Sequence, residues 1–80
     1  MPTFLVTVVN ETYASRNHHD AATASDAYQQ AIRGALEIGV DEVSKGKPFF
    51  GAEVRVENGD SLVGRFVVSV GASPLQSPAA

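Results

Sequence analysis

The first strand-like stretch of the chain is Thr3–Val9. It is rich in β-branched side chains and apolar on both sides, which is typical of a β-strand. Successive side chains of a strand point to opposite faces. The stretch therefore has two rows: Phe4, Val6 and Val8 on one face, and Leu5, Thr7 and Val9 on the other.

The clearest element is an amphipathic helix that starts near residue 23. Thr23 and Asp26 fit a capping box, and a carboxylate in the first turn suits the helix dipole. Apolar positions recur at three-and-four spacing: Ala24, Ala27, Tyr28, Ala31, Ile32, Ala35, Leu36 and Gly39. Polar positions cover the opposite side: Gln29, Gln30, Arg33, Glu37 and Asp41. The alanines form a thin ridge that lets the helix lie close to a sheet.

Two positions compete for the end of this helix. Gly46 followed by Pro48 is a good stop signal. A break at Gly39 would instead keep Glu42 away from the apolar side. We expect a helix that reaches about Ser44 with a distorted last turn.

Residues 10–22 are polar, with Tyr13 as their one large apolar side chain. They form either a loop or a short strand over residues 15–20 that folds back on the first strand. Long unstructured loops are uncommon in compact domains, which favours the strand.

Two further strands are predicted after the helix. Phe49–Glu57 alternates, with Phe50, Ala52, Val54 and Val56 inward and Glu53, Arg55 and Glu57 outward. Leu62–Val70 follows, with Leu62, Gly64, Phe66, Val68 and Val70 inward. The polar residues between the two strands are turn formers.

The alternation also predicts the register of this hairpin. We expect a three-residue loop, 58–60, which pairs Val54 with Gly64 and places Glu53 opposite Arg65. One of the last two loop residues then has a positive φ.

These elements predict an α+β domain over residues 1–72, with a single helix on one face of a three- or four-stranded antiparallel sheet. The last strand is the longest and most apolar, so we place it centrally, between the first strand and Phe49–Glu57. Residues 73–80 are predicted to be a flexible tail in which Leu75 could dock.

Composition narrows the functional class. The 80 residues carry a net charge of −3, which argues against a generic DNA-binding domain. The chain has no cysteine, and a secreted domain this small usually needs disulfides, so we expect a cytoplasmic protein. No apolar run reaches about 18 residues, so we expect no membrane span.

Two surfaces are candidate binding sites for a protein partner. The sheet face away from the helix is predicted to carry Leu5, Val9, Phe49, Val63 and Val67. An apolar face of this kind predicts self-association through the face or an exposed edge, giving a homodimer. The second candidate is an acidic surface that includes Glu37, Asp41, Glu53 and Glu57.

The sequence gives little sign of catalysis or of a cofactor. His18 and His19 are adjacent, and adjacent side chains of a strand point apart, so we expect no metal site. No serine lies in a nucleophile-elbow pattern, and we expect no enzymatic activity. A weaker alternative is single-strand nucleic-acid binding by Phe49, Arg55 and Arg65, which Glu53 and Glu57 would oppose.

The layout resembles that of small phage-type anti-CRISPR proteins with one helix on an antiparallel sheet. The resemblance rests on the strand-to-helix junction Asp20-Ala21-Ala22-Thr23-Ala24-Ser25-Asp26-Ala27 and on the later hairpin through Glu53-Val54-Arg55-Val56. It implies an inhibitor that binds a CRISPR effector complex by surface contact, without catalysis. A homodimeric domain with a cellular protein partner is the alternative.

Overall fold

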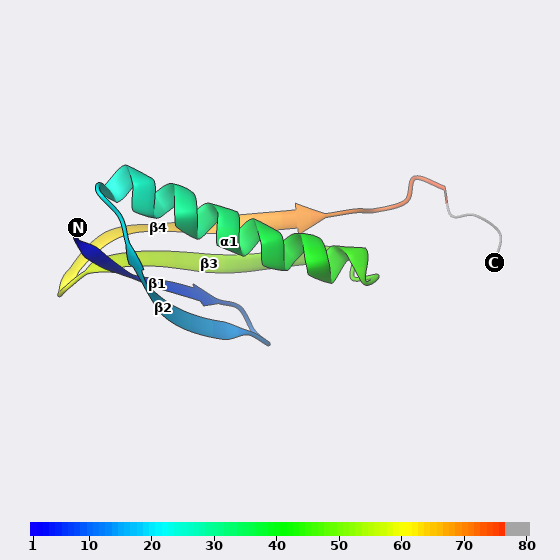
Figure 1. Cartoon of the computed structure of the whole chain (residues 1–80). Helices are drawn as coiled ribbons and strands as arrows, with labels where there is room; N and C mark the ends of the chain where they lie inside the picture. The colour runs from blue at the N-terminus through cyan, green and yellow to red at the C-terminus, as the bar shows by residue number, and fades with distance from the viewer. Residues whose placement is uncertain (77–80) are drawn as a thin grey trace.

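A computed structural model describes residues 1–76 as one helix packed on one face of a four-stranded antiparallel sheet (Figure 1). The predicted α+β class is confirmed. The elements are β1 (Thr3–Val9), β2 (Ala14–Asp20), α1 (Ala24–Ser44), β3 (Phe49–Asn58) and β4 (Ser61–Gly71).

The strands lie in the order β2-β1-β3-β4, so the predicted central position of the last strand is wrong. β1 pairs with β3, and β4 is an outer strand. Val54 and Val56 of β3 are the largest side chains that are completely buried. Because the helix covers only one face, the inner strand β3 still alternates with charged residues, and overall hydrophobicity does not reveal which strand is central.

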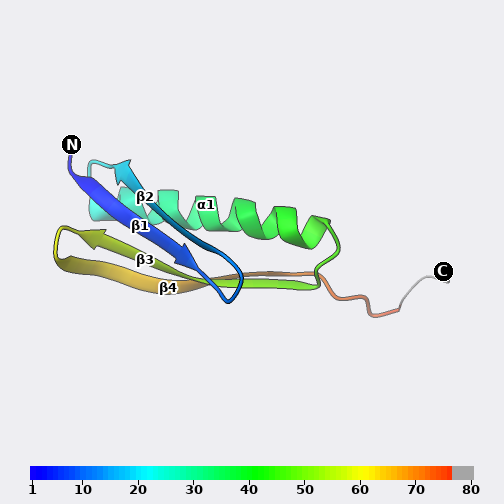
Figure 2. The same cartoon turned by 90° about the horizontal axis from the view of Figure 1, so that it is seen from below.

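The polar stretch after β1 forms a strand, as the prediction favoured. Ala14–Asp20 pairs with β1 along its whole length. Asn10 closes the turn: its backbone N–H donates to the Tyr13 carbonyl at 2.8 Å, and its side chain donates to the Gly51 carbonyl at 3.1 Å. The β1–β2 hairpin is twisted relative to the β3–β4 hairpin (Figure 2).

The β3–β4 hairpin has a tighter turn than predicted. Asn58 pairs with Ser61, which leaves a two-residue loop, and Gly59 has the positive φ of +60°. Val54 therefore lies opposite Phe66 rather than Gly64, a shift of two residues. The shift keeps every side chain of this part of β4 on its predicted face, because side chains alternate with period two.

Because of a β-bulge between Val56 and Glu57, two side chains of β4 have the opposite orientation to the one predicted. It leaves Val63 as an extra residue in β4. Leu62 pairs with the outward Glu57 and is exposed, although we predicted it to be inward. Val63, predicted to point outward, packs against the core, and its carbonyl accepts a hydrogen bond from the Tyr28 hydroxyl.

The two ends of α1 are capped as the sequence suggests. The Asp26 N–H donates to the Thr23 hydroxyl at 3.1 Å. At the other end Gly46 has φ +111°, and the N–H groups of Gly46 and Lys47 donate to carbonyls of the last turn. These two bonds form a Schellman motif, which is the distortion expected near Ser44.

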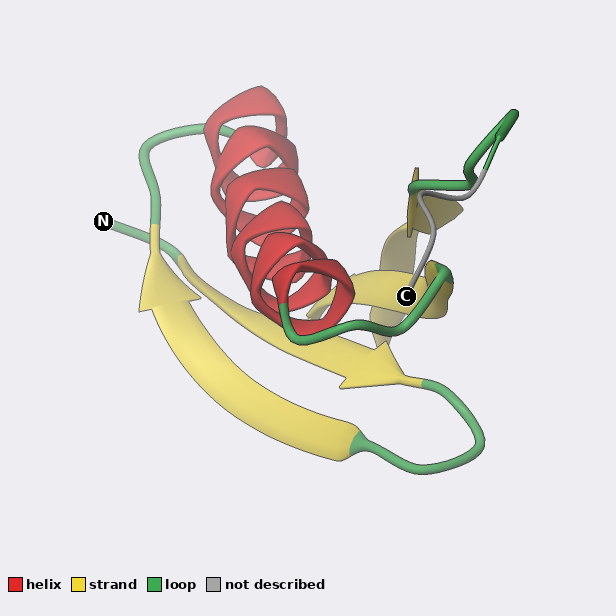
Figure 3. Cartoon of the chain, turned by 90° about the vertical axis from the view of Figure 1, so that its right-hand side faces the viewer, coloured by secondary structure: helices red, strands yellow, loops and turns green. Residues whose placement is uncertain are grey.

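The helix buries its small residues against the sheet. Its buried positions are Ala27, Ala31, Ala35 and Gly39. A Cβ atom at Gly39 would lie only 2.7 Å from Val70 and 2.8 Å from Phe50, so glycine is required by close packing and the helix runs through it unbroken. The sheet curves around the helix (Figure 3), which contacts mainly β3 and β4.

Residues 72–76, which follow β4, do not return to the core. Ala72 donates a backbone hydrogen bond to the Pro48 carbonyl at 2.9 Å. Leu75 is fully exposed, so the predicted docking of this residue is wrong. The rest of the predicted tail, 77–80, lies outside the described residues.

Candidate interaction surface

Three large apolar side chains of α1 lie outside the core. Ile32, Leu36 and Val40 are 37%, 40% and 55% exposed. They are four residues apart and therefore form a row along one flank of the helix, which we call the apolar stripe. We predicted Ile32 and Leu36 to belong to the buried face, and the structure places them only at its margin.

The spacing of the alanines explains why the larger side chains are displaced. Ala27, Ala31 and Ala35 recur every fourth residue and bring the helix axis close to the sheet. Ile32 and Leu36 each follow one of these alanines and are rotated by about 100° from it. Ile32 and Leu36 therefore extend from the flank of the helix, whereas Tyr28 and Ile38 still pack against the core beside the alanines.

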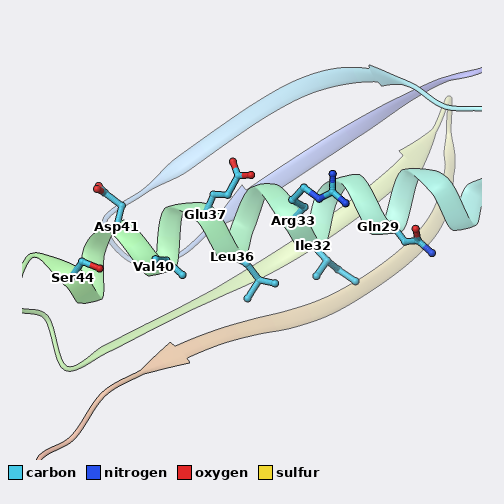
Figure 4. Close-up of a pocket in the computed structure, with 8 residues that line it drawn as sticks. All are labelled: Gln29, Ile32, Arg33, Leu36, Glu37, Val40, Asp41 and Ser44. Carbon is cyan, nitrogen blue, oxygen red and sulfur yellow. The ribbon is translucent and has the colours of Figure 1, made fainter.

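The stripe lines an open groove of about 700 Å³ (Figure 4). In this view Ile32 and Leu36 extend from the helix toward the side where β4 runs. Polar and charged residues border the apolar ones; the lining residues other than the stripe are Gln29, Arg33, Glu37, Asp41 and Ser44. The groove is therefore an apolar strip with a charged rim, the usual composition of a protein-binding surface.

The residues that line this groove all belong to α1. β4 runs on the side toward which Ile32 and Leu36 extend, and it has an open edge (Figure 4). Among the residues described, β4 pairs with β3 alone. It is 11 residues long, contains no proline and carries one charged residue, Arg65. A long apolar edge strand with so little protection readily pairs with another strand.

The opposite edge of the sheet has a different character. β2 has the sequence ASRNHHD, with most of its side chains exposed. Arg16, His18 and Asp20 lie on one face of it, and such polar and charged side chains discourage strand addition. Within residues 1–76, only the β4 edge therefore combines unpaired backbone with apolar side chains.

The predicted apolar sheet face is divided rather than continuous. Leu5 and Val9 are half-buried, whereas Phe49 is exposed at the far end of β3, where its ring lies over Gly51. Val67 is 73% exposed, but Glu53 lies between it and Val9 in the same cross-strand row. With Val63 turned to the core, four of the five predicted residues remain on this face.

Glu53 organises the centre of that face. Arg65 donates two hydrogen bonds to its carboxylate, at 3.1 and 3.2 Å, and Arg55 lies 3.6 Å from it. Glu53 and Arg65 share a face as predicted, although diagonally. The hydrogen bond from Arg65 is the main cause that lowers the pKa of Glu53, and the same bond raises the pKa of Arg65.

The four predicted acidic residues form two separate groups. Glu37 and Asp41 line the groove on the helix. Asp41 also forms an i,i+4 ion pair with Lys45 at 2.8 Å, and this contact raises the pKa of Lys45. Glu53 and Glu57 lie on the outer sheet face. Because Glu53 binds both arginines, it also occupies the cations that a nucleic-acid site would need.

The two histidines lie on opposite faces of β2. His18 pairs with the outward Leu5, and His19 pairs with the buried Phe4. Within the described part of the chain, no three His, Cys, Asp or Glu side chains are grouped closely enough to hold a metal ion.

Sequence reasoning missed the apolar stripe. The signal for it was the regular four-residue spacing of the alanines, which marks the true centre of the buried face and leaves Ile32 and Leu36 beside it. Val40 was not assigned to either face.

Comparison with known proteins gives no further guidance. No protein-family model, curated protein or solved structure matches the chain. No helix in residues 1–76 is both long enough and apolar enough to cross a membrane.

Proposed function

We propose that this chain is a non-catalytic interaction domain that binds another polypeptide along the apolar stripe and the β4 edge. One observation carries the proposal. Three large apolar side chains of the helix, Ile32, Leu36 and Val40, are exposed on one flank of it. Ile32 and Leu36 extend toward the side of β4, whose outer edge is unpaired among the described residues (Figure 4).

A bound partner would contribute favourable interactions both at the apolar stripe and at the β4 edge. Complete burial of a Leu, Ile or Val side chain contributes about 1.5–3 kcal/mol, and a large part of that remains unused at Leu36 and Val40. An added strand would satisfy the free N–H and C=O groups of β4 by main-chain hydrogen bonds. A polypeptide is the class of ligand that offers both contacts together.

Position-specific photo-crosslinking in the cells that produce the protein tests this function. A benzophenone amino acid at Leu36 is expected to form adducts with polypeptide, identified by mass spectrometry. The matched control places the same amino acid at Gln30, an exposed residue on the flank of α1 that faces β2. Equal labelling at both positions, or none at Leu36, contradicts the proposal.

The CRISPR-inhibitor role is a narrower form of the same proposal, supported by the resemblance in layout. Glu37 and Asp41 border the groove and would suit a basic surface of an effector complex. A purified CRISPR surveillance complex should then retain the wild-type chain, and Glu37→Lys should weaken retention. Failure of the complex to retain the wild-type chain removes this partner and leaves the general function standing.

A further inference from the structure

We infer that the polypeptide bound by this surface is a second copy of the chain. In this dimer the β4 strands of two copies pair antiparallel to give one eight-stranded sheet, and the two α1 helices lie side by side on the same face. The inference rests on the proposed function and names the partner.

Ile32 and Leu36 of the stripe extend toward the side of the helix on which β4 runs (Figure 4). The Tyr28 hydroxyl bonds to the Val63 carbonyl, and Gly39 is packed against Val70. These two contacts hold α1 alongside β4 over most of the strand. A chain that pairs with β4 therefore also meets the flank of the helix that carries the stripe.

The stripe is complementary to itself under a two-fold rotation. Ile32 and Val40 lie four residues on either side of Leu36. When two such helices pack antiparallel about Leu36, each Leu36 meets its copy and each Ile32 meets the Val40 of the other helix. A symmetric dimer interface must have this property, since one patch meets the same patch.

The β4–β4 pairing that accompanies this helix arrangement also brings favourable side chains opposite each other. Tyr28 of the helix contacts Gly64 of β4, and Gly39 contacts Val70. Leu36 lies between Tyr28 and Gly39 along the helix and is therefore level with about Val68. Pairing centred on Val68 then sets Phe66 opposite Val70 on the face under the helices, an aromatic and β-branched pair of the favourable kind. The outward pairs are Arg65 with Gly71 and Val67 with Ser69. No like charges face each other.

The charges along the groove complement each other in the same arrangement. Arg33 and Glu37 are on the rim of the stripe. In the antiparallel dimer, Arg33 of one helix lies close to Glu37 of the other helix. Their positions along the helix axes differ by about two residues, or ~3 Å. Parallel helices would place each residue at the level of its own copy, arginine beside arginine.

The extent of the surface is adequate for a small dimer. Pairing of about seven residues of each β4 strand, together with contacts between three side chains of each helix, would bury on the order of 1,200 Å² of surface. The smallest stable protein interfaces bury a similar area. The single chain has a thin core, in which Val54 and Val56 are the largest fully buried side chains. A domain of this size gains in stability from joining its core to another.

Solution mass is the first test. Sedimentation equilibrium is expected to give twice the 8.4 kDa of the single chain for the wild type. Leu36→Glu should give the monomer mass, with an unchanged circular dichroism spectrum. The control Gln30→Glu introduces the same charge on the other flank of α1 and should remain dimeric. A wild-type monomer at 100 μM overturns the inference.

Disulfide trapping tests the geometry and does not depend on the folding of Leu36→Glu. The chain has no cysteine, so each introduced thiol is unique. Leu36→Cys should form a covalent dimer under mild oxidation. A mixture of Ile32→Cys and Val40→Cys should give mainly the mixed disulfide, whereas parallel helices would give the two homodisulfides and overturn the arrangement.

The two proposals fail differently. If the wild type is a monomer and the crosslinks at position 36 lead to a different protein, the second copy is rejected and the interaction function is retained. If the wild type is a monomer and position 36 gives no adduct, both are rejected.

Discussion

Two glycines of α1, Gly34 and Gly39, have opposite surroundings. A Cβ atom at Gly34 would have no atom within 4 Å apart from its own helix and chain neighbours, whereas one at Gly39 would collide with Val70 and Phe50. Glycine lowers helix stability at both positions, but only at Gly39 does close packing against the sheet compensate for this loss. The same residue type thus has a structural role at one position and none at the other.

Substitution by alanine should therefore have opposite effects at the two sites. Gly34→Ala is expected to raise the free energy of unfolding by about 0.5–1 kcal/mol through helix propensity. Gly39→Ala should lower it by about 1–3 kcal/mol because the extra methyl overpacks the core. Urea unfolding of both variants measures the difference, and equal effects would show that the helix is not held this close to the sheet.

The ion pair of Glu53 with Arg65 predicts a pH dependence of stability. The folded-state pKa of Glu53 is lowered, so the folded chain binds its proton less readily than the unfolded chain does. The contribution to stability is thus present above the ordinary glutamate pKa and is lost as the pH falls below about 4.

Glu53→Gln should show this dependence by difference. At pH 7 the variant is expected to melt at a lower temperature than the wild type, and the gap should narrow as the pH is lowered toward 3. Glu57→Gln, on the same face, is the control. A gap for Glu53→Gln that stays constant with pH would mean that the ion pair does not contribute.

At the scale of elements, α1 depends on its ends as well as on its packing. The Thr23 hydroxyl satisfies one N–H group of the first turn, and the Schellman motif at Gly46 satisfies carbonyls of the last. Both signals could be predicted from sequence because capping chemistry is local. The limits of the helix were accordingly predicted well.

Removal of the N-terminal cap should have a measurable cost. Thr23→Ala is expected to lower the free energy of unfolding by about 0.5–2 kcal/mol, because the Asp26 N–H loses its acceptor. Thr23→Ser keeps a hydroxyl and should cost only a few tenths of a kcal/mol. Chemical denaturation of the two variants checks this, and similar losses would point to the threonine methyl group instead of the cap.

Strand faces were predictable to the same extent as the helix, but the strand neighbours were not. Alternation identified the inward rows of β1 and β3, since one buried face is sufficient to produce period two. It could not reveal the bulge that reverses Leu62 and Val63, because a bulge depends on the cross-strand hydrogen bonds. Placing β4 at the centre failed because its apolar character belongs to an open edge.

At the scale of the whole molecule, the candidate surface combines two features from distant parts of the sequence. The apolar stripe lies on the helix, and the free strand edge follows about 20 residues later. Neither feature is distinctive in the sequence alone. An apolar row on a helix predicts a buried face, and an apolar strand predicts a central position in the sheet. Only the position of α1 over β3 and β4 makes them one surface.

A dimer of the kind inferred above should show stability that depends on concentration. Because association binds only the folded chain, the melting temperature of the wild type should rise with protein concentration between 1 and 100 μM. Leu36→Glu should melt at a temperature independent of concentration. Scanning calorimetry at several concentrations makes the comparison, and a flat wild-type series would contradict the dimer.

The polar character of β2 limits how far the sheet can extend. Once two β4 strands have joined, both outer borders of the enlarged sheet are β2 strands bearing Arg16, His18 and Asp20. Those borders repel the addition of a third chain, so growth ends at two copies. The same apolar edge that would seed fibrils in an unprotected sheet is thereby confined to a closed, finite assembly.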